Sequence, residues 1–165
     1  MTEIEQNPHP FITHLERLAD DRAALAELRR GLGRDPGEAA GMFPYVVPFI
    51  SSVYDEDLYY LIASLFALSP ESARSGNMGE HLRIYAQTVG DDTATTRRFT
   101  HLLRQRRSML AVPLRQHISM LKSKEIAVNW HQLMRDLQRW DSEERYVQKQ
   151  WANAYWKPET PKSTR

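Results

Sequence analysis

The segment from Thr95 to Leu110, TTRRFTHLLRQRRSML, contains five arginines and no acidic residue. When this segment is wound as a helix at about 100° per residue, its apolar residues fall on one side and a ridge of arginines on the other. The apolar side is formed by Phe99, Leu102, Leu103 and Leu110, and the ridge by Arg97, Arg104 and Arg107. Because the planar arginine side chain forms paired hydrogen bonds with phosphate, this pattern indicates a surface that binds a polyanion.

The excess of positive charge extends beyond this segment. From Thr93 to Lys124 the chain has eight Lys or Arg residues and no Asp or Glu, although its total formal charge is only +1. The rest of the chain therefore carries −7, and such a separation of charge steers a polyanion toward one face of a protein. The alternative is that carboxylates from other segments pair with these arginines, which would then only solvate a helix face.

Three further features of the basic residues affect this interpretation. Arg98 lies at the edge of the apolar arc, where its stem can cover apolar neighbours while its guanidinium reaches solvent. Arg106 falls in the middle of that arc, so we expect the helix to bend or end near it. A second basic group, Arg29, Arg30 and Arg34, closes another predicted helix, where the helix dipole alone favours cations.

No pattern typical of catalysis or of a metal site is apparent. The chain has no cysteine and six histidines, and the histidines do not pair at ligand spacing. The acidic clusters at residues 20–21 and 55–57 lie where helices are expected to begin, so the helix dipole accounts for them. We therefore expect a protein that is not an enzyme and that needs neither a metal nor a cofactor.

The aromatic residues near the C-terminus have two interpretations. Trp130, Trp140, Trp151, Trp156 and Tyr155 could stack on nucleobases, as in proteins that bind single strands. However, Trp130 and Trp140 share one helical face, and Trp151 and Tyr155 share another, which is typical of a core. We expect these side chains to be buried, with Trp156 the exposed member.

A helical framework is expected to position these residues. The chain has 165 residues, of which 41% are hydrophobic and 26% charged, values typical of a folded protein with a core of its own. Apolar residues recur at helical spacing and no alternating pattern favours strands. The predicted fold class is all-α, a bundle of roughly eight helices. The predicted helix N-caps are Asp20 or Asp21, Asp55, Asn77, Asn129 and Asp141, and two further helices are predicted at residues 93–108 and 114–123.

The predicted domain organisation is simple. We expect a flexible N-terminus at residues 1–9, one helical domain at 10–156, and a flexible tail at 157–165. If the domain divides into two lobes, their boundary is expected near residues 90–113. No run of about 18 apolar residues is present, and the N-terminus MTEIEQNPHP is acidic and polar, unlike a secretory signal. Together with the absence of cysteine, this predicts a cytoplasmic protein that does not enter a membrane.

Several different short motifs occur along the chain in a characteristic order. They are Leu28-Arg29-Arg30, Leu65-Phe66-Ala67 with Pro70, Met78-Gly79, Arg98-Phe99 with Leu102-Leu103, Val128-Asn129-Trp130, Leu133, Asp136-Leu137, Trp140, and Trp151 with Tyr155. Together they resemble the CasB family, the small subunit of the type I-E CRISPR surveillance complex, Cascade. The resemblance extends from about Phe11 to Tyr155 and is loose between Leu32 and Val53. Asn129 stands where the family commonly has an Asp, which keeps a capping group.

The resemblance implies a non-catalytic helical protein that forms a homodimer among the other Cascade subunits. Such a protein contacts guide RNA and target DNA through their phosphates and helps to hold the displaced strand, so that the R-loop stays open. In such systems base pairing reads the sequence, whereas the protein reads shape and charge. The basic residues that match the family pattern are Arg29, Arg30, Arg98, Arg104, Arg107 and Arg115. Arg97, Lys122 and Lys124 are added as nucleic-acid contacts from the charge pattern alone.

Two functions of other classes stay open from the sequence. One is a stand-alone helical DNA-binding regulator, which would need base-reading side chains on a recognition helix. The other is an interaction scaffold whose arginine ridge meets an acidic protein partner.

Overall fold

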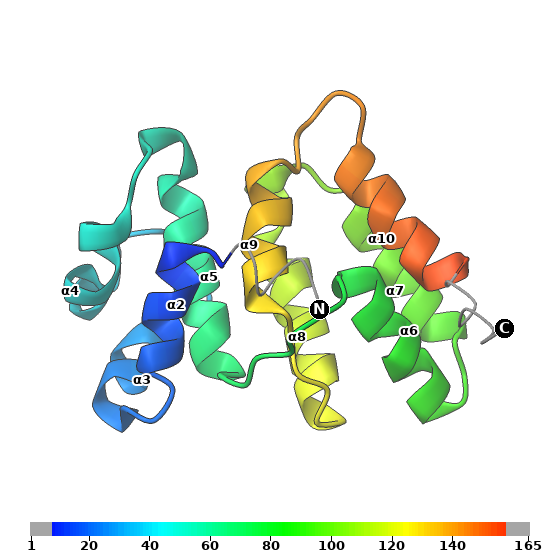
Figure 1. Cartoon of the computed structure of the whole chain (residues 1–165), viewed down its shortest axis with the longest axis horizontal. Helices are drawn as coiled ribbons and strands as arrows, with labels where there is room; N and C mark the ends of the chain where they lie inside the picture. The colour runs from blue at the N-terminus through cyan, green and yellow to red at the C-terminus, as the bar shows by residue number, and fades with distance from the viewer. Residues whose placement is uncertain (1–7, 158–165) are drawn as a thin grey trace, which may run out of the picture.

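The computed structural model describes residues 8–157, which fold into nine α-helices joined by short turns (Figure 1). The α-helices are α2 (Pro10–Arg17), α3 (Arg22–Arg29), α4 (Phe43–Val46), α5 (Glu56–Leu68), α6 (Met78–Val89), α7 (Thr93–Leu103), α8 (Ala111–Ser123), α9 (Trp130–Gln138) and α10 (Tyr146–Trp156). The 3-10 turns are η1 (Ala40–Met42), η2 (Val47–Phe49), η3 (Val53–Asp55) and η4 (Arg107–Met109). These residues form no strand, and a single isolated bridge joins Ser72 to Val128. The predicted all-α fold is confirmed.

The helices form two groups that share a central pair. In Figure 1, α2 to α5 lie on the left, α6, α7 and α10 lie on the right, and α8 and α9 lie between them. α9 packs against α2 and α5, although it follows α8 in the sequence, and α10 packs along α6. The buried apolar side chains of residues 8–157 therefore form one continuous core. A lobe boundary at residues 90–113 would separate α6 from α8, two helices that contact each other.

Three tryptophans form the centre of this core. Trp130, Trp140 and Trp151 are each at most 1% exposed. Each indole N–H is paired as well as buried: Trp130 donates to the carbonyl of Ser69, Trp140 to that of Gln105, and Trp151 to the carboxylate of Asp136. A buried indole needs such an acceptor. The prediction that these residues belong to the core is confirmed, as is the exposure of Trp156, which is 50% exposed.

Gly79 explains the Met78-Gly79 motif. It lies where α6 and α10 approach most closely, because a Cβ atom added at Gly79 would lie 2.0 Å from the carbonyl oxygen of Trp151. That oxygen belongs to the backbone of α10 and cannot move aside without moving the helix. Glycine is therefore required here for close contact between two helices rather than for an unusual backbone angle.

Three of the predicted caps are confirmed. The side chain of Asp21 accepts a hydrogen bond from the N–H of Ala24 at the start of α3. Asn77 and Asn129 accept in the same way at the starts of α6 and α9. Each of these bonds satisfies an N–H group that has no partner within its own helix.

The predictions for Asp55, Asp141 and residue 114 need correction. Asp55 occupies the N-cap position of α5 but forms no cap hydrogen bond. The helix predicted to follow Asp141 begins only at Tyr146, after Arg145 in the left-handed region. α8 begins at Ala111 rather than at residue 114, with Pro113 in its first turn, where a missing N–H costs no helical hydrogen bond.

The N-terminal boundary also differs from the prediction. His9, expected in a flexible segment, is buried and caps α2 by accepting from the N–H of Phe11. Its own N–H donates to Nδ1 of His131 over 2.9 Å, which ties the start of α2 to α9. The remaining residues of the two predicted flexible ends, 1–7 and 158–165, lie outside the described residues. Within 8–157, no helix has the length and apolar character needed to cross a bilayer.

Candidate nucleic-acid interface

The arginine-rich segment is a helix followed by a tight turn, rather than one helix over residues 93–108. α7 ends at Leu103, with Arg104 as its C-cap residue. Arg106 has an extended backbone, with φ −78° and ψ 157°, and its exposed side chain precedes η4. The prediction that the helix ends near Arg106 is confirmed. The break keeps Arg106 out of the apolar core that a continuous helix would have forced it into.

Arg107 does not belong to an outward ridge, so the prediction that it faces solvent with Arg97 and Arg104 is wrong. Its Nη2 lies 2.8 Å from Oδ1 of Asp55, and the two side chains are 10% and 15% exposed. The same nitrogen donates to the carbonyl of Tyr54, whose ring lies 4.4 Å from the guanidinium carbon. An arginine held by a carboxylate, a carbonyl and an aromatic face is occupied by the protein itself.

Residues 103–107, which we call the anchored segment, are held by several further hydrogen bonds. The N–H of Arg107 donates to Oδ1 of Asp141. The carbonyl of Gln105 accepts from Trp140, and that of Leu103 accepts from Arg145. The two aspartates predicted to cap helices therefore hold Arg107 instead: the carboxylate of Asp55 binds its guanidinium, and the carboxylate of Asp141 accepts from its backbone N–H.

The other basic residues between Thr93 and Lys124 behave differently from Arg107. None of them forms an ion pair with a carboxylate within residues 8–157. Six are exposed and Arg98 is half-buried. We call these seven the free basic set: Arg97, Arg98, Arg104, Arg106, Arg115, Lys122 and Lys124. The idea that carboxylates from other segments neutralise this stretch is therefore wrong for all but one of its eight cations.

The second basic group is only partly free. Arg30 pairs with Glu27 over 3.3 Å, but its side chain is 71% exposed and the pair joins neighbours on one helix. Such an exposed pair is weak and can exchange for a phosphate. Arg29 is exposed, and its Nε donates to the carbonyl of Leu25 at 3.4 Å. Both side chains stay accessible at the end of α3.

α8 brings the two basic groups toward each other. α5 lies on one side of α8, and α6 and α7 lie on the other (Figure 1). Arg115 of α8 and Arg34 of the loop after α3 line the same cleft. The prediction that Arg34 closes a helix is wrong, because α3 ends at Arg29. Gly31 and Gly33 between them were the signal that Arg34 belongs to a loop.

On its other side α8 buries a neutral histidine beneath the basic residues. His117 is fully buried, and its Nδ1 donates to the carbonyl of Pro113 over 2.7 Å. Burial lowers its pKa, the hydrogen bond to Pro113 opposes that shift, and the positive charge of Arg98 lowers it again. Because this histidine stays uncharged at neutral pH, it adds no positive charge to the region.

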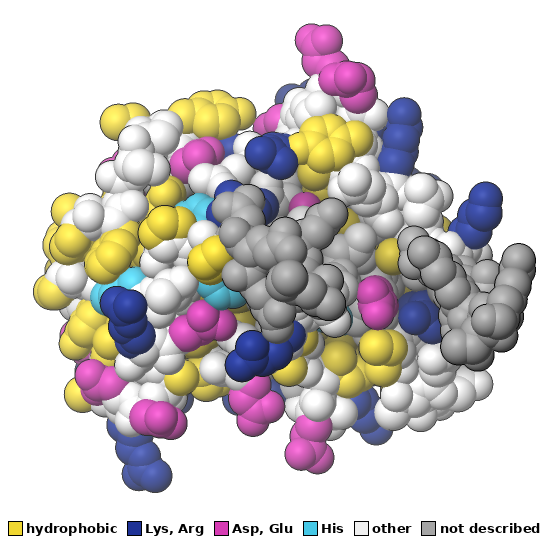
Figure 2. All heavy atoms as spheres, viewed as in Figure 1, with side chains coloured by type: hydrophobic (Ala, Val, Ile, Leu, Met, Phe, Trp, Pro, Cys, Tyr) yellow, Lys and Arg dark blue, Asp and Glu magenta, His cyan; other side chains and the backbone are white. Residues whose placement is uncertain are grey.

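The face shown in Figure 2 is not uniformly charged. Basic and acidic side chains are scattered over it, and hydrophobic side chains gather on the left, over α4 and the turns beside it. Exposed apolar residues of that part of the chain include Phe43, Val47, Val53 and Tyr54. Within the described part of the chain, no three His, Asp or Glu residues are grouped so that they could hold a metal ion.

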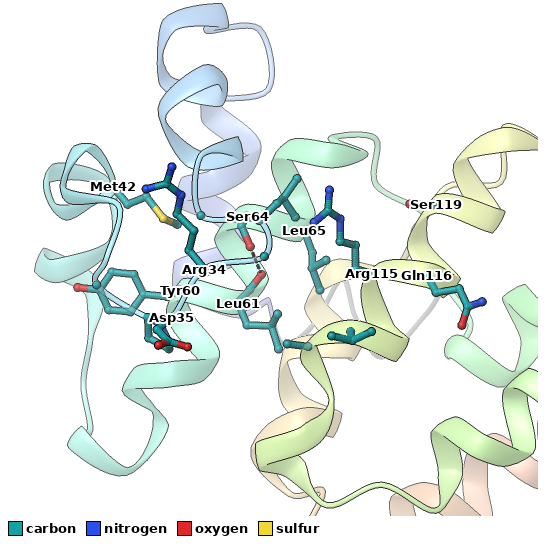
Figure 3. Close-up of a pocket in the computed structure, with 17 residues that line it drawn as sticks. Arg34, Asp35, Met42, Tyr60, Leu61, Ser64, Leu65, Arg115, Gln116 and Ser119 are labelled. Atoms are coloured by element: carbon teal, nitrogen blue, oxygen red, sulfur yellow. Dashed lines mark hydrogen bonds between the residues drawn. The ribbon is translucent and has the colours of Figure 1, made fainter.

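A mostly apolar cleft of about 520 Å³ lies between residues 31–37, α5 and α8 (Figure 3). Leu61, Leu65 and Tyr60 line it from α5, and Val112 lines it from the start of α8. Arg34 and Arg115 point in the same direction from opposite sides of the cleft, whereas Asp35 lies beside Tyr60 and points the other way. No local sequence pattern marks this cleft, because its walls come from three separate segments.

Comparison with known proteins identifies the family. The family model of CRISPR-associated protein Cse2 matches residues 24–156. The CRISPR-associated protein Cse2 of Thermus thermophilus is 31% identical over 153 residues, 88% of each chain. The crystal structure of CasB from Thermus thermophilus is similar with a TM-score of 0.77 and 30% identity, over 94% of this chain and 99% of that one. A chain of a solved CRISPR RNA-guided surveillance complex is similar with a TM-score of 0.76 and 28% identity, over 88% of each chain. The resemblance inferred from short motifs is thus confirmed, and the chain belongs to the Cse2 (CasB) family of CRISPR-associated proteins.

Proposed function

We propose that this chain is the non-catalytic small subunit of a type I-E Cascade complex. In this role it holds the phosphates of guide RNA and target DNA, and it holds the displaced strand so that the R-loop stays open. Its family supports the proposal, and so does its similarity to a chain of a CRISPR RNA-guided surveillance complex. The proposal includes the other Cascade subunits and a second copy of this chain as partners.

The observation that carries the nucleic-acid part of the proposal is the free basic set. Seven cations between Thr93 and Lys124 lack a carboxylate partner in residues 8–157. Like charges gathered without counter-charges repel one another, so an external anion stabilises them. Phosphates of a nucleic acid are such anions, and they release bound counterions when Lys or Arg replaces these ions.

The proposed contact residues differ from those expected from the sequence. Arg107 is removed because Asp55 and Tyr54 occupy its guanidinium. Arg34 and Arg106 are added because both are exposed and neither has an ion pair among the described residues. The proposed phosphate contacts are Arg29, Arg30, Arg34, Arg97, Arg98, Arg104, Arg106, Arg115, Lys122 and Lys124.

The test is the affinity for a single-stranded oligonucleotide at several salt concentrations. Replacing Arg104 with Ala should weaken binding to unrelated sequences equally and reduce the log–log salt slope by about 0.7. Arg22→Ala is the matched control, since Arg22 is an exposed arginine outside both basic groups. If Arg104→Ala and Arg22→Ala both leave affinity and slope unchanged, Arg104 is not a phosphate contact.

The partner part of the proposal has its own test. Treating a cell lysate with nuclease before purification distinguishes assembly through protein from assembly through nucleic acid. We expect the chain to co-purify with the other Cascade subunits together with a protected RNA. Co-purification with an acidic protein and no RNA would instead support the scaffold function.

A further inference from the structure

We propose that the cleft between residues 31–37, α5 and α8 receives one unstacked nucleobase of the bound strand, with Arg34 and Arg115 on the flanking phosphates. The inference rests on the proposed function and adds to it. Phosphate contacts alone hold a strand only by its backbone. A base-binding cleft would in addition hold a single strand in an unpaired state.

The shape and lining of the cleft suit a nucleobase. Its volume of about 520 Å³ lies within the range of small-molecule sites, and most of its lining is apolar. Leu61, Leu65 and Val112 supply apolar contacts, and Tyr60 lines the cleft beside Arg34. The hydroxyl of Ser64 is already committed, because it donates to the carbonyl of Leu61 over 2.9 Å. Gln116 and Ser119 of α8 add polar groups to the lining.

The two arginines stand where the strand would enter and leave. Figure 3 shows the side chains of Arg34 and Arg115 pointing in the same direction from opposite sides of the cleft, one from the loop and one from α8. Arg115 reaches the loop itself, since its Nη1 lies 3.2 Å from where a Cβ of Gly33 would stand. Neither arginine has an ion pair among the described residues. Asp35 would repel a phosphate, but its carboxylate lies beside Tyr60 and points away from both guanidinium groups.

Charge favours a nucleotide over an apolar protein side chain in this cleft. An inserted Leu or Phe would use the apolar walls but would leave both guanidinium groups without anions. A nucleotide matches both the apolar walls and the two guanidinium groups, because its base faces are apolar and a phosphate lies on each side of its sugar.

Trp156, at the end of α10, is the other candidate for base stacking, and it is less suitable than the cleft. One face of its indole already stacks on Phe99, with ring centroids 5.5 Å apart. The hollow beside it is lined by Asp91 and Asp92 as well as Arg83, so two negative charges oppose a single positive one against a nucleic-acid backbone. Trp156→Ala is therefore the matched control for a variant of the cleft.

The experiment compares a short oligothymidylate with an oligomer of equal length that has the same backbone but abasic sugars. Binding of both to the full-length chain is followed by fluorescence anisotropy. Phosphate contacts alone predict equal affinities, whereas a stacked base predicts that the oligothymidylate binds at least about fivefold tighter. Val112→Trp places an indole at the mouth of the cleft from a position that is 81% exposed, so the fold should be kept.

Val112→Trp should abolish the preference for the base-containing strand and leave the affinity for the abasic strand unchanged. Trp156→Ala should keep the preference, and Arg115→Ala should weaken binding of both strands.

Equal affinities in the wild type would overturn the base cleft but leave the proposed function standing, whereas no binding of either strand would overturn both. A preference that survives Val112→Trp but is lost in Trp156→Ala would move the base site to Trp156. Loss of assembly with Cascade subunits in Val112→Trp, with the base preference intact, would make the cleft a protein-docking site.

Discussion

Arg104 and Arg107 lie three residues apart, and the sequence predicts the same role for both, but they belong to two different regions of the molecule. Arg104 is exposed and has no ion pair among the described residues, as in the rest of the free basic set. Arg107 belongs to the anchored segment, where Asp55, Tyr54 and Asp141 hold it. The difference shows that charge density along a chain overestimates the number of available charges. An arginine becomes available only if no buried carboxylate reaches it.

Substituting Arg107 should give the largest effect and separates the two regions most clearly. Arg107→Ala leaves Asp55 largely buried without its cation, which should lower the free energy of unfolding by about 3 kcal/mol. Arg104→Ala should change it by less than about 0.5 kcal/mol, because exposed substitutions cost little. Urea denaturation measures both values. Equal stabilities for the two variants would mean that the anchored segment contributes nothing to stability.

The pH dependence of stability should reflect two buried groups, Asp136 and His81, which carry opposite charges when ionised. Burial raises the pKa of Asp136 to about 6, although hydrogen bonds from Trp151 and Gln132 oppose the shift. A raised pKa means that Asp136 stabilises the fold most below pH 3.8 and that this contribution is lost as the pH rises to 6. Burial lowers the pKa of His81 to about 4, so its contribution is present above pH 6.5 and is lost as the pH falls to 4.

These two contributions nearly cancel between pH 7 and pH 4, since each amounts to about 3 kcal/mol. Asp136→Asn removes one of them. Relative to the wild type, the variant should therefore lose about 3 kcal/mol more stability on acidification from neutral pH to about pH 4. Denaturation curves recorded across this range test the prediction. A variant whose pH profile matches that of the wild type would show that Asp136 titrates at an ordinary pKa.

A smaller effect is expected at the backbone anchors of the anchored segment. Trp140→Phe keeps most of the buried aromatic volume but removes the N–H that donates to the carbonyl of Gln105 over 2.8 Å. An unpaired buried carbonyl costs about 1–3 kcal/mol. The loss of unfolding free energy should be smaller than for Arg107→Ala, and amide exchange should quicken at the Arg107 N–H. Unchanged exchange there would show that Trp140 does not restrain residues 103–107.

The sequence predicts the local features well. The caps Asp21, Asn77 and Asn129 and the burial of Trp130 follow from neighbours within a few residues, where propensity and periodicity apply. The break near Arg106 was also predictable, because an arginine in an apolar arc cannot stay on a continuous buried face.

The failures at the anchored segment and at the cleft are long-range. Asp55 and Asp141 have the composition of helix caps, but their partner Arg107 lies 52 and 34 residues away in the chain. A local cap competes with such a contact, and only the assembled fold decides between them. The cleft of Arg34 and Arg115 was not predictable for the same reason, since residues 31–37, α5 and α8 meet only after folding.

The most direct measurement of the central claim is the salt dependence of single-strand binding for a combined variant. Replacing Arg97, Arg104 and Arg115 with Ala removes three members of the free basic set. We expect the variant to remain folded, and the log–log salt slope to fall by about 2 units, which is roughly 0.7 for each lost phosphate contact. A folded triple variant with the slope and affinity of the wild type would contradict the claim that the free basic set binds phosphate.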